Sequence, residues 1–96
     1  MKERKFDFGE LAATSAVAEM AGNNPVFSSF VDTCIVRHLC GDWGDLCDED
    51  KEINEECLRN GGRLFSSYIF PDTKEKLWII TEADRSVTTV LFPSDY

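Results

Sequence analysis

The sequence predicts an α+β fold in which N-terminal helices pack on a C-terminal three-stranded antiparallel β-meander. Three observations lead to this prediction. Helical spacing and capping residues are confined to residues 14–60, β-branched and aromatic runs to residues 63–92, and short turn sequences separate those runs. The chain has 96 residues, of which 43% are hydrophobic. That length and composition suit a single domain, residues 1–96, with one packed core.

Residues 1–13 open with a basic tip and continue with Phe6 and Phe8 in alternation. Alternating apolar residues favour an extended backbone over a helical turn. We therefore expect this segment to form a short edge strand or an ordered N-terminal arm. Acidic residues interrupt the apolar stretch that follows the basic tip, so we expect no secretory signal peptide.

The first two helices are predicted over residues 14–21 and 25–39. The first is rich in alanine, and Gly22 fits the left-handed position that follows a helix. Asn24 caps the second helix, and Pro25 at its first position loses no hydrogen bond. Apolar residues then recur at helical spacing and predict one buried face: Phe27, Phe30, Val31, Cys34, Ile35 and His38.

A third helix is predicted over residues 48–60. Its first three residues are acidic and complement the positive end of the helix dipole, and Arg59 complements the negative end. Ile53, Cys57 and Leu58 predict a narrow apolar face, and two glycines end the helix.

Three strands are predicted over residues 63–70, 76–82 and 86–92, joined by short turns as in an antiparallel meander. Apolar residues occupy both faces of the last two strands, whereas a sheet with one solvated face alternates apolar and polar residues. Helices can cover one face, so the other is either covered by the N-terminal arm or left as a partner surface. We expect a homodimer through the face or free edge of the 76–92 hairpin.

The charge balance limits the classes of partner. Acidic residues number 18 and basic residues 10, which gives a net charge of −8. Such a chain lacks the basic face that general nucleic-acid binding and membrane-surface binding require. No apolar run approaches the ~20 residues of a membrane span. We therefore expect a cytoplasmic protein whose partner is a basic protein or nucleic-acid-binding machinery.

Acidic residues dominate residues 42–56, where a single lysine accompanies them. A charge run of this kind is typically the solvated face of a helix, but acids spaced along a rigid helix can also dock onto a basic groove. The tryptophan beside the run either anchors such a contact or fills space between the second and third helices. The candidate partner-binding residues are Asp42, Trp43, Asp45, Asp48, Glu49, Glu52, Glu55 and Glu56.

The cysteines do not form a recognisable metal or disulfide pattern. No C-x-x-C pair occurs among Cys34, Cys40, Cys47 and Cys57. Cys34 lies on the predicted buried face of the second helix. Cys34 and His38 share a helix face and could act as nucleophile and base, but no third residue stands in an orienting position. We predict reduced thiols, no metal, no cofactor and no catalytic residues.

Three segments resemble a known group of proteins: GDWGD at residues 41–45, GGRLFSSY at 61–68 and WIITEADRSVTT at 78–89. The match covers residues 36–96 and is to small, mostly uncharacterised proteins of bacterial plasmids, phages and integrative elements. The resemblance implies a cytosolic bacterial setting and a mobile-element origin, and it supplies no catalytic residues.

Small acidic proteins of mobile elements include inhibitors of restriction and CRISPR systems, although that step is an analogy of size, charge and context. We therefore expect a non-enzymatic binding protein that inhibits a nucleic-acid-handling host system. The alternative is a structural or regulatory module that homodimerises through its sheet.

Overall fold

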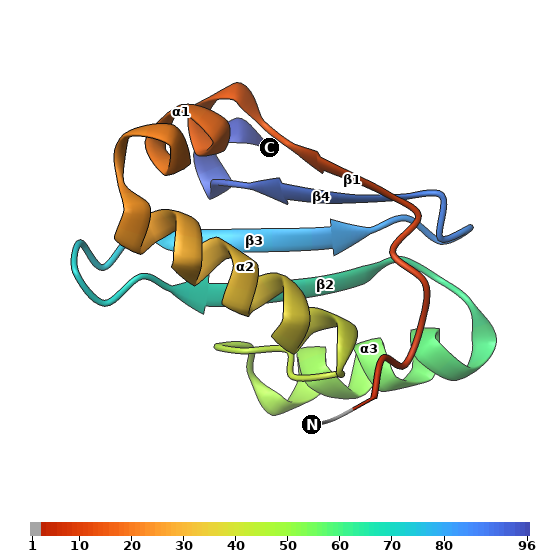
Figure 1. The fold of residues 1–96 in the computed structure, drawn as a ribbon. Helices are drawn as coiled ribbons and strands as arrows, with labels where there is room; N and C mark the ends of the chain where they lie inside the picture. Colours follow the sequence, from red (N-terminus) through yellow and green to blue (C-terminus); the bar gives the residue numbers. More distant parts are fainter. Residues whose placement is uncertain (1–2) are drawn as a thin grey trace.

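A mixed four-stranded sheet forms the middle of the fold, and helices α1 and α2 pack on one of its faces (Figure 1). The computed structural model describes residues 3–96, so the first two residues of the predicted arm lie outside the described residues. The elements are β1 (Glu10–Ala13), α1 (Ser15–Asn23), α2 (Pro25–Leu39), α3 (Asp48–Asn60), β2 (Leu64–Ile69), β3 (Lys76–Thr81), β4 (Val87–Leu91) and a 3-10 helix (Pro93–Asp95). The strand order in the sheet is β1-β4-β3-β2.

The α+β class is confirmed, and β2, β3 and β4 form an antiparallel meander, but the prediction that the sheet has only these three strands is wrong. β1 joins the sheet parallel to β4, with Glu10 opposite Val87, so the sheet is mixed and has a fourth strand. The strand also begins later than the Phe6–Phe8 alternation that suggested it. Gly9 separates the two, because its φ of 66° turns the chain where a side chain would overlap the backbone of Ser86.

The helix predictions hold where local capping signals are strong. α2 spans the predicted residues, and the Asn24 side chain accepts hydrogen bonds from the N–H groups of Val26 and Phe27, each at 3.1 Å. α3 also has its predicted bounds. The prediction for α1 is wrong at its end: Gly22 lies inside the helix, which continues to Asn23 before Asn24 adopts an extended φ of −138°. Gly22 is not in the left-handed conformation expected after a helix, and open space surrounds it.

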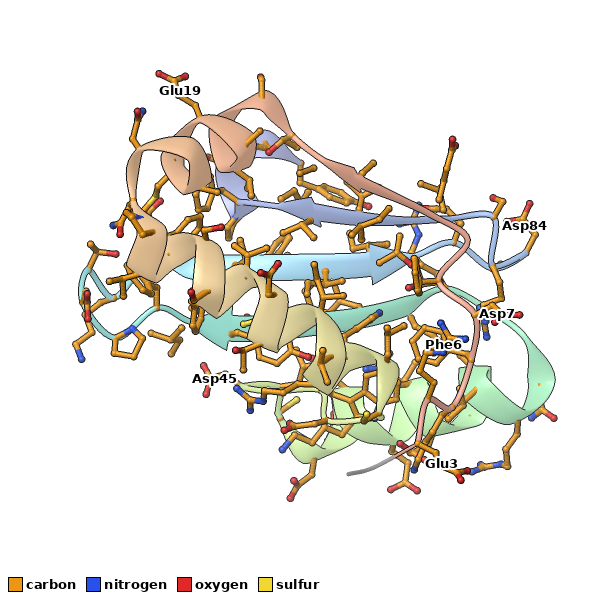
Figure 2. The ribbon with its side chains drawn as sticks, viewed as in Figure 1. Glu3, Phe6, Asp7, Glu19, Asp45 and Asp84 are labelled. Carbon is orange, nitrogen blue, oxygen red and sulfur yellow. The ribbon has the colours of Figure 1, made fainter. Side chains whose placement is uncertain are left out.

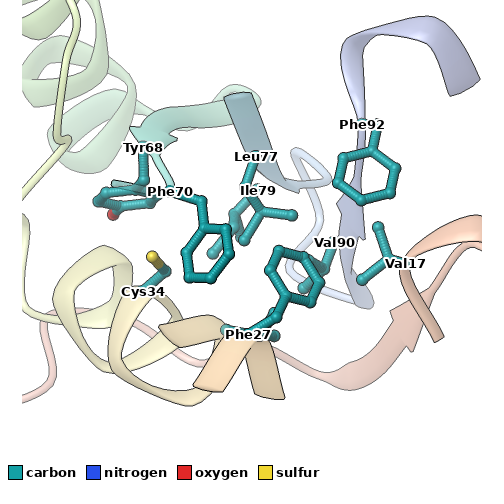
Figure 3. Close-up of a cluster of buried hydrophobic side chains, with 10 residues drawn as sticks. Val17, Phe27, Cys34, Tyr68, Phe70, Leu77, Ile79, Val90 and Phe92 are labelled. Atoms are coloured by element: carbon teal, nitrogen blue, oxygen red, sulfur yellow. The ribbon is translucent and has the colours of Figure 1, made fainter. Parts of the chain in front are cut away.

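The hydrophobic core lies between α1, α2 and the sheet, and Figure 3 shows its side chains converging from these elements. Phe27 of α2 is fully buried and makes an edge-to-face contact with Phe70, at 5.2 Å between ring centroids. Its ring also lies 5.9 Å from that of Phe92, which follows β4. α2 therefore bridges both halves of the sheet.

The second face of the sheet is also apolar, as predicted, but the N-terminal arm does not cover it. The arm places Phe6 on the helix side, 5.3 Å from the His38 ring. On the second face, Trp78 packs edge-to-face on Phe65 and on Tyr96, with ring centroids 5.0 and 6.0 Å apart. Aromatic side chains from the strands and from the C-terminal residue therefore pack on one another on this face.

Candidate functional site

The acidic helix α3 lies along the outer edge of β2 and is fixed there by Asn54 (Figure 1). The Asn54 side-chain amide donates to the carbonyl of Phe65 at 2.6 Å, and its oxygen accepts from the N–H of the same residue at 3.1 Å. Asn54 is 3% exposed. Its carboxamide thus takes the place of a neighbouring strand's peptide group and satisfies two backbone groups of an edge strand.

The predicted apolar face of this helix is wrong in one residue. Ile53 is 56% exposed, while its neighbour Asn54 is buried. Hydrophobic spacing could not identify this arrangement, because the side chain that docks the helix is polar and its partner is a backbone group elsewhere in the chain. The only local signal was an asparagine in the middle of a helix, where it has poor intrinsic propensity.

Trp43 fills space inside the molecule and does not project as a contact anchor. It is 3% exposed, and its indole N–H donates to the Glu55 carboxylate at 2.7 Å. Its ring stacks on Phe6 and makes an edge-to-face contact with His38. Both Trp43 and Glu55 are therefore engaged within the chain, and the space-filling alternative is the one that matches their position.

Asp42 is likewise engaged within the chain. Its carboxylate accepts from Nε of Arg37 at 2.8 Å and from the second guanidinium nitrogen at 3.2 Å, and this pairing raises the pKa of Arg37. The same carboxylate accepts from the N–H of Gly44, at 3.2 Å. Asp42 therefore shapes the turn between α2 and α3.

The remaining candidate acids are exposed: Asp45, Asp48, Glu49, Glu52 and Glu56. Figure 2 shows the Asp45 side chain pointing away from the ribbon. Among residues 3–96, the ion pairs join other residues, namely Arg4–Asp7, Arg37–Asp42 and Arg63–Glu82. Residues three and four apart on a helix are neighbours, so Asp48, Glu52 and Glu56 form one row. We call these five exposed acids the α3 acidic surface.

A buried chain of hydrogen bonds crosses the sheet from β2 to the N-terminal arm, and it is centred on His38. The His38 ring bonds through Nδ1 to the Ser66 hydroxyl and through Nε2 to the Thr81 hydroxyl, at 2.9 Å for the latter. Thr81 lies 2.7 Å from the Thr88 hydroxyl, which donates to the Phe8 carbonyl at 2.8 Å. This series of hydrogen bonds therefore links three hydroxyl groups and one imidazole and ends at the backbone carbonyl of Phe8.

This arrangement fixes the proton positions. Thr88 gives its only hydroxyl proton to a carbonyl, so Thr81 must donate to Thr88. Thr81 can then only accept from His38, which places the imidazole proton on Nε2 and leaves Nδ1 to accept from Ser66. The histidine is neutral in this state, and its ring joins β2 to β3 by hydrogen bonds.

The Cys34–His38 pair is poorly suited to nucleophilic chemistry. Burial lowers the pKa of His38 to about 3 and raises the pKa of Cys34 to about 12. A base that stays neutral in this way is weak, and a thiol that stays protonated is a poor nucleophile. The hydrogen bonds of His38 go to hydroxyl groups of the sheet. The geometry supports a structural role for both residues.

The four cysteines are free and differ in exposure: Cys34 is buried, Cys40 and Cys57 are half-buried, and Cys47 is exposed. Across residues 3–96, no three His, Cys, Asp or Glu side chains gather in a way that could hold a metal ion. None of the helices in that range combines the length and apolar character needed to cross a membrane. Comparison of the chain with protein-family models, curated proteins and solved structures finds no match.

Proposed function

We propose that this chain is a non-enzymatic binding protein that engages a basic partner through the α3 acidic surface. The observation that supports this is the division among the candidate acids. Asp42 and Glu55 are bound to groups of the chain itself, whereas the acids of the surface are exposed and none belongs to an ion pair between residues 3 and 96. Adjacent like charges destabilise a helix by a few tenths of a kcal/mol per pair, and a cationic partner would relieve that cost.

The helix that carries four of these five acids is held in place by several hydrogen bonds. Asn54 fixes its middle to β2, and Glu55 accepts a hydrogen bond from Trp43. At its C-terminal end, the Arg85 guanidinium donates to the carbonyls of Cys57, at 3.1 Å, and Gly62, at 2.6 Å. A surface positioned in this way loses little conformational entropy on binding, which favours affinity.

The partner that suits this surface is a protein that itself handles nucleic acid, since such proteins carry basic grooves. Occupying such a groove would make this chain an inhibitor of its partner. A net charge of −8 disfavours direct binding to nucleic acid. The resemblance to small proteins of bacterial plasmids, phages and integrative elements adds the proposal of a cytoplasmic, mobile-element setting.

The test starts from the partner that the tagged chain captures in a bacterial host and mass spectrometry identifies. Affinity is then measured by calorimetry with the purified pair. We expect Glu52→Lys with Glu56→Lys to weaken binding by at least about tenfold and to reduce its salt dependence. The matched control is Glu19→Lys with Glu75→Lys, which makes the same change in net charge at exposed positions outside α3.

Two outcomes would overturn the proposed function. In the first, both double variants bind the partner as the unmodified chain does, which would make the acids a solvated face. In the second, the unmodified chain binds duplex DNA directly at physiological salt.

A further inference from the structure

The outer side of β1 carries backbone groups that no other element of the described chain pairs. The N–H of Glu10 donates to Ser86 at 2.9 Å, and that of Thr14 donates to Val90 at 3.1 Å. Alternate residues of a strand point their peptide groups the same way, so the backbone of Leu11 and Ala13 faces away from β4. All four residues of β1 are exposed.

An apolar groove of about 250 Å³ lies beside this strand, between β1 and the two helices α1 and α2. Leu11 and Ala13 line it, together with Val31 and Ile35 of α2. In the sheet, Ala13 is opposite Val90, whose side chain belongs to the core on the helix side. Leu11 points to that same side and is 49% exposed. The strand therefore offers hydrogen-bonding groups and an adjoining apolar surface together.

We propose that a second copy of this chain pairs with β1 in antiparallel orientation, with a two-fold axis at Ala12. The free peptide groups belong to residues 11 and 13, so the antiparallel register that pairs both of them sets Leu11 opposite Ala13 of the second copy, and the reverse. The two facing pairs in this register are equivalent, as a two-fold axis requires. Each of the two facing pairs would exchange two hydrogen bonds, about four in all.

The side chains suit this register. Ala12 lies on the axis, where two copies of the residue meet on the second face of the sheet, and its small side chain allows close approach. Leu11 of each copy lies beside the second copy's Ala13, which leaves room for the leucines to meet diagonally over the grooves. Glu10 falls opposite Thr14 of the second copy, so the two Glu10 carboxylates stay at opposite ends of the paired strands.

The rest of the fold leaves this edge accessible. Helix α1 follows the C-terminal end of β1, so the two-fold axis places the two copies of α1 at opposite ends of the shared strands (Figure 1). The 76–92 hairpin, where we expected self-association, has no free edge, because β3 and β4 are the two inner strands. Pairing through β1 leaves α3 free at the far edge of each copy. The dimer goes beyond the proposed function and would make it bivalent.

The first test is the oligomeric state, measured by light scattering and sedimentation over micromolar to millimolar protein. We expect a dimer whose dissociation constant rises by at least about tenfold in Ala13→Pro, a change equivalent to ~1.4 kcal/mol. Proline removes an N–H that faces outward and leaves the pairing with β4 intact. Ala13→Ser, which keeps the N–H and nearly the same side-chain volume, is the matched control and should still form the dimer. Leu11→Arg provides a second disruptive variant should the proline variant fail to fold.

The second test reads the register. In this register, Ala12 of one copy lies directly opposite Ala12 of the other and forms a non-hydrogen-bonded pair. The Cα atoms of such a pair are about 4.5 Å apart, a separation that a disulfide can span. We expect Ala12→Cys to form a disulfide-linked dimer under mild oxidation. Glu10→Cys, which is as exposed but lies far from its counterpart, should not exceed the background from the four native cysteines.

Salt distinguishes this dimer from binding of a basic partner. Two copies that each carry −8 repel, so added salt should tighten the dimer and weaken the proposed binding through α3. The proposal is overturned by a monomer at every concentration, by a dimer that persists in both Ala13→Pro and Leu11→Arg, or by a cross-link at position 10 that equals the one at position 12. None of these outcomes bears on the α3 acidic surface.

Discussion

The two edges of the sheet differ in how their backbone groups are satisfied. At the β2 edge, Phe65 is paired by the side chain of Asn54. Further along the same edge, the N–H of Asp45 donates to Ser67 at 2.6 Å, and the N–H of Ser67 donates to Trp43 at 3.3 Å. At the β1 edge, Leu11 and Ala13 have no such neighbours in the described chain. One edge is closed by the chain and the other is open.

The difference shows that closing an edge requires particular residues and is not a consequence of compactness. The closed edge needs a carboxamide at position 54, and it needs a glycine at position 44, where the chain passes against β2. The open edge is only four residues long, and short edge strands are one way in which proteins limit unwanted pairing. An edge that is short and also flanked by an apolar groove suits one specific pairing.

The closed edge predicts the largest effect of a single substitution. Gly44 has a φ of 74°, and a Cβ there would overlap the carbonyl oxygen of Ser67. We expect Gly44→Ala to lower the free energy of unfolding by at least about 3 kcal/mol, measured by urea denaturation. Gly22→Ala is the matched control, because Gly22 is helical and has open space around it. It should stabilise the protein by ~0.5 kcal/mol, and equal effects of the two would contradict this account of the β2 edge.

The side chain that closes the edge predicts the next effect. Asn54→Ala leaves the N–H and C=O of Phe65 without their partner at a half-buried position, which should lower the free energy of unfolding by about 2–4 kcal/mol. Asn54→Asp keeps the acceptor for the N–H and places a charge against the carbonyl, so it should not rescue stability. Asn60→Ala, at the exposed end of the same helix, serves as the control. A loss as small as that of the control would show that water can replace the carboxamide.

A pH effect tests the chain of hydrogen bonds that runs between the two edges. His38 links β2 and β3, and Thr88 carries the chain to the segment before β1. Burial lowers the pKa of His38 to about 3 from its ordinary value of 6.5, so between these values the unfolded state binds the extra proton. The stabilisation is therefore complete above pH 6.5 and is lost as pH falls towards 3.

The expected loss is several kcal/mol, since one pKa unit corresponds to about 1.4 kcal/mol. Urea denaturation at pH 7 and pH 4.5 measures the part of this loss that falls between the two values, about 3 kcal/mol. Carboxylates also titrate in this range, so the decisive measurement is an NMR titration of the single histidine. Its ring should remain neutral at pH 5, and a midpoint near 6.5 in the folded protein would disprove the burial effect.

The sequence predicts those parts of the fold that depend on neighbouring residues. Asn24 and Pro25 define the start of α2 because capping and a fixed φ are local effects. Residues 10–13 show neither β-branched residues nor alternation, and their strand exists because β4 provides a partner about 77 positions away along the chain. Gly22 fits a helix end by type, but the chain leaves the helix only where Asn24 must cap the next one.

The candidate site follows the same division. The acidic character of residues 42–56 is a property of composition and could be predicted. Which acids remain exposed depends on polar partners in neighbouring elements: Asp42 accepts hydrogen bonds from Arg37, and Glu55 accepts one from Trp43. The burial of Asn54 depends on a backbone group in β2. Hydrophobic spacing contains no information about such polar pairs, so the sequence could not reveal them.

The smallest expected effect is that of a proline in β1, and it tests whether the β1 edge is open and the β2 edge closed. Ala13→Pro removes an outward N–H from β1 and should change the free energy of unfolding of the monomer by less than about 1 kcal/mol, measured under dilute conditions. Ser67→Pro, on the same edge as Phe65, removes the N–H that donates to the Trp43 carbonyl, so it should cost several times more. If the two prolines destabilise the monomer equally, β1 is paired by some group of the chain and its edge is closed. Unequal costs leave Leu11 and Ala13 available, which is the condition that any pairing at this edge requires.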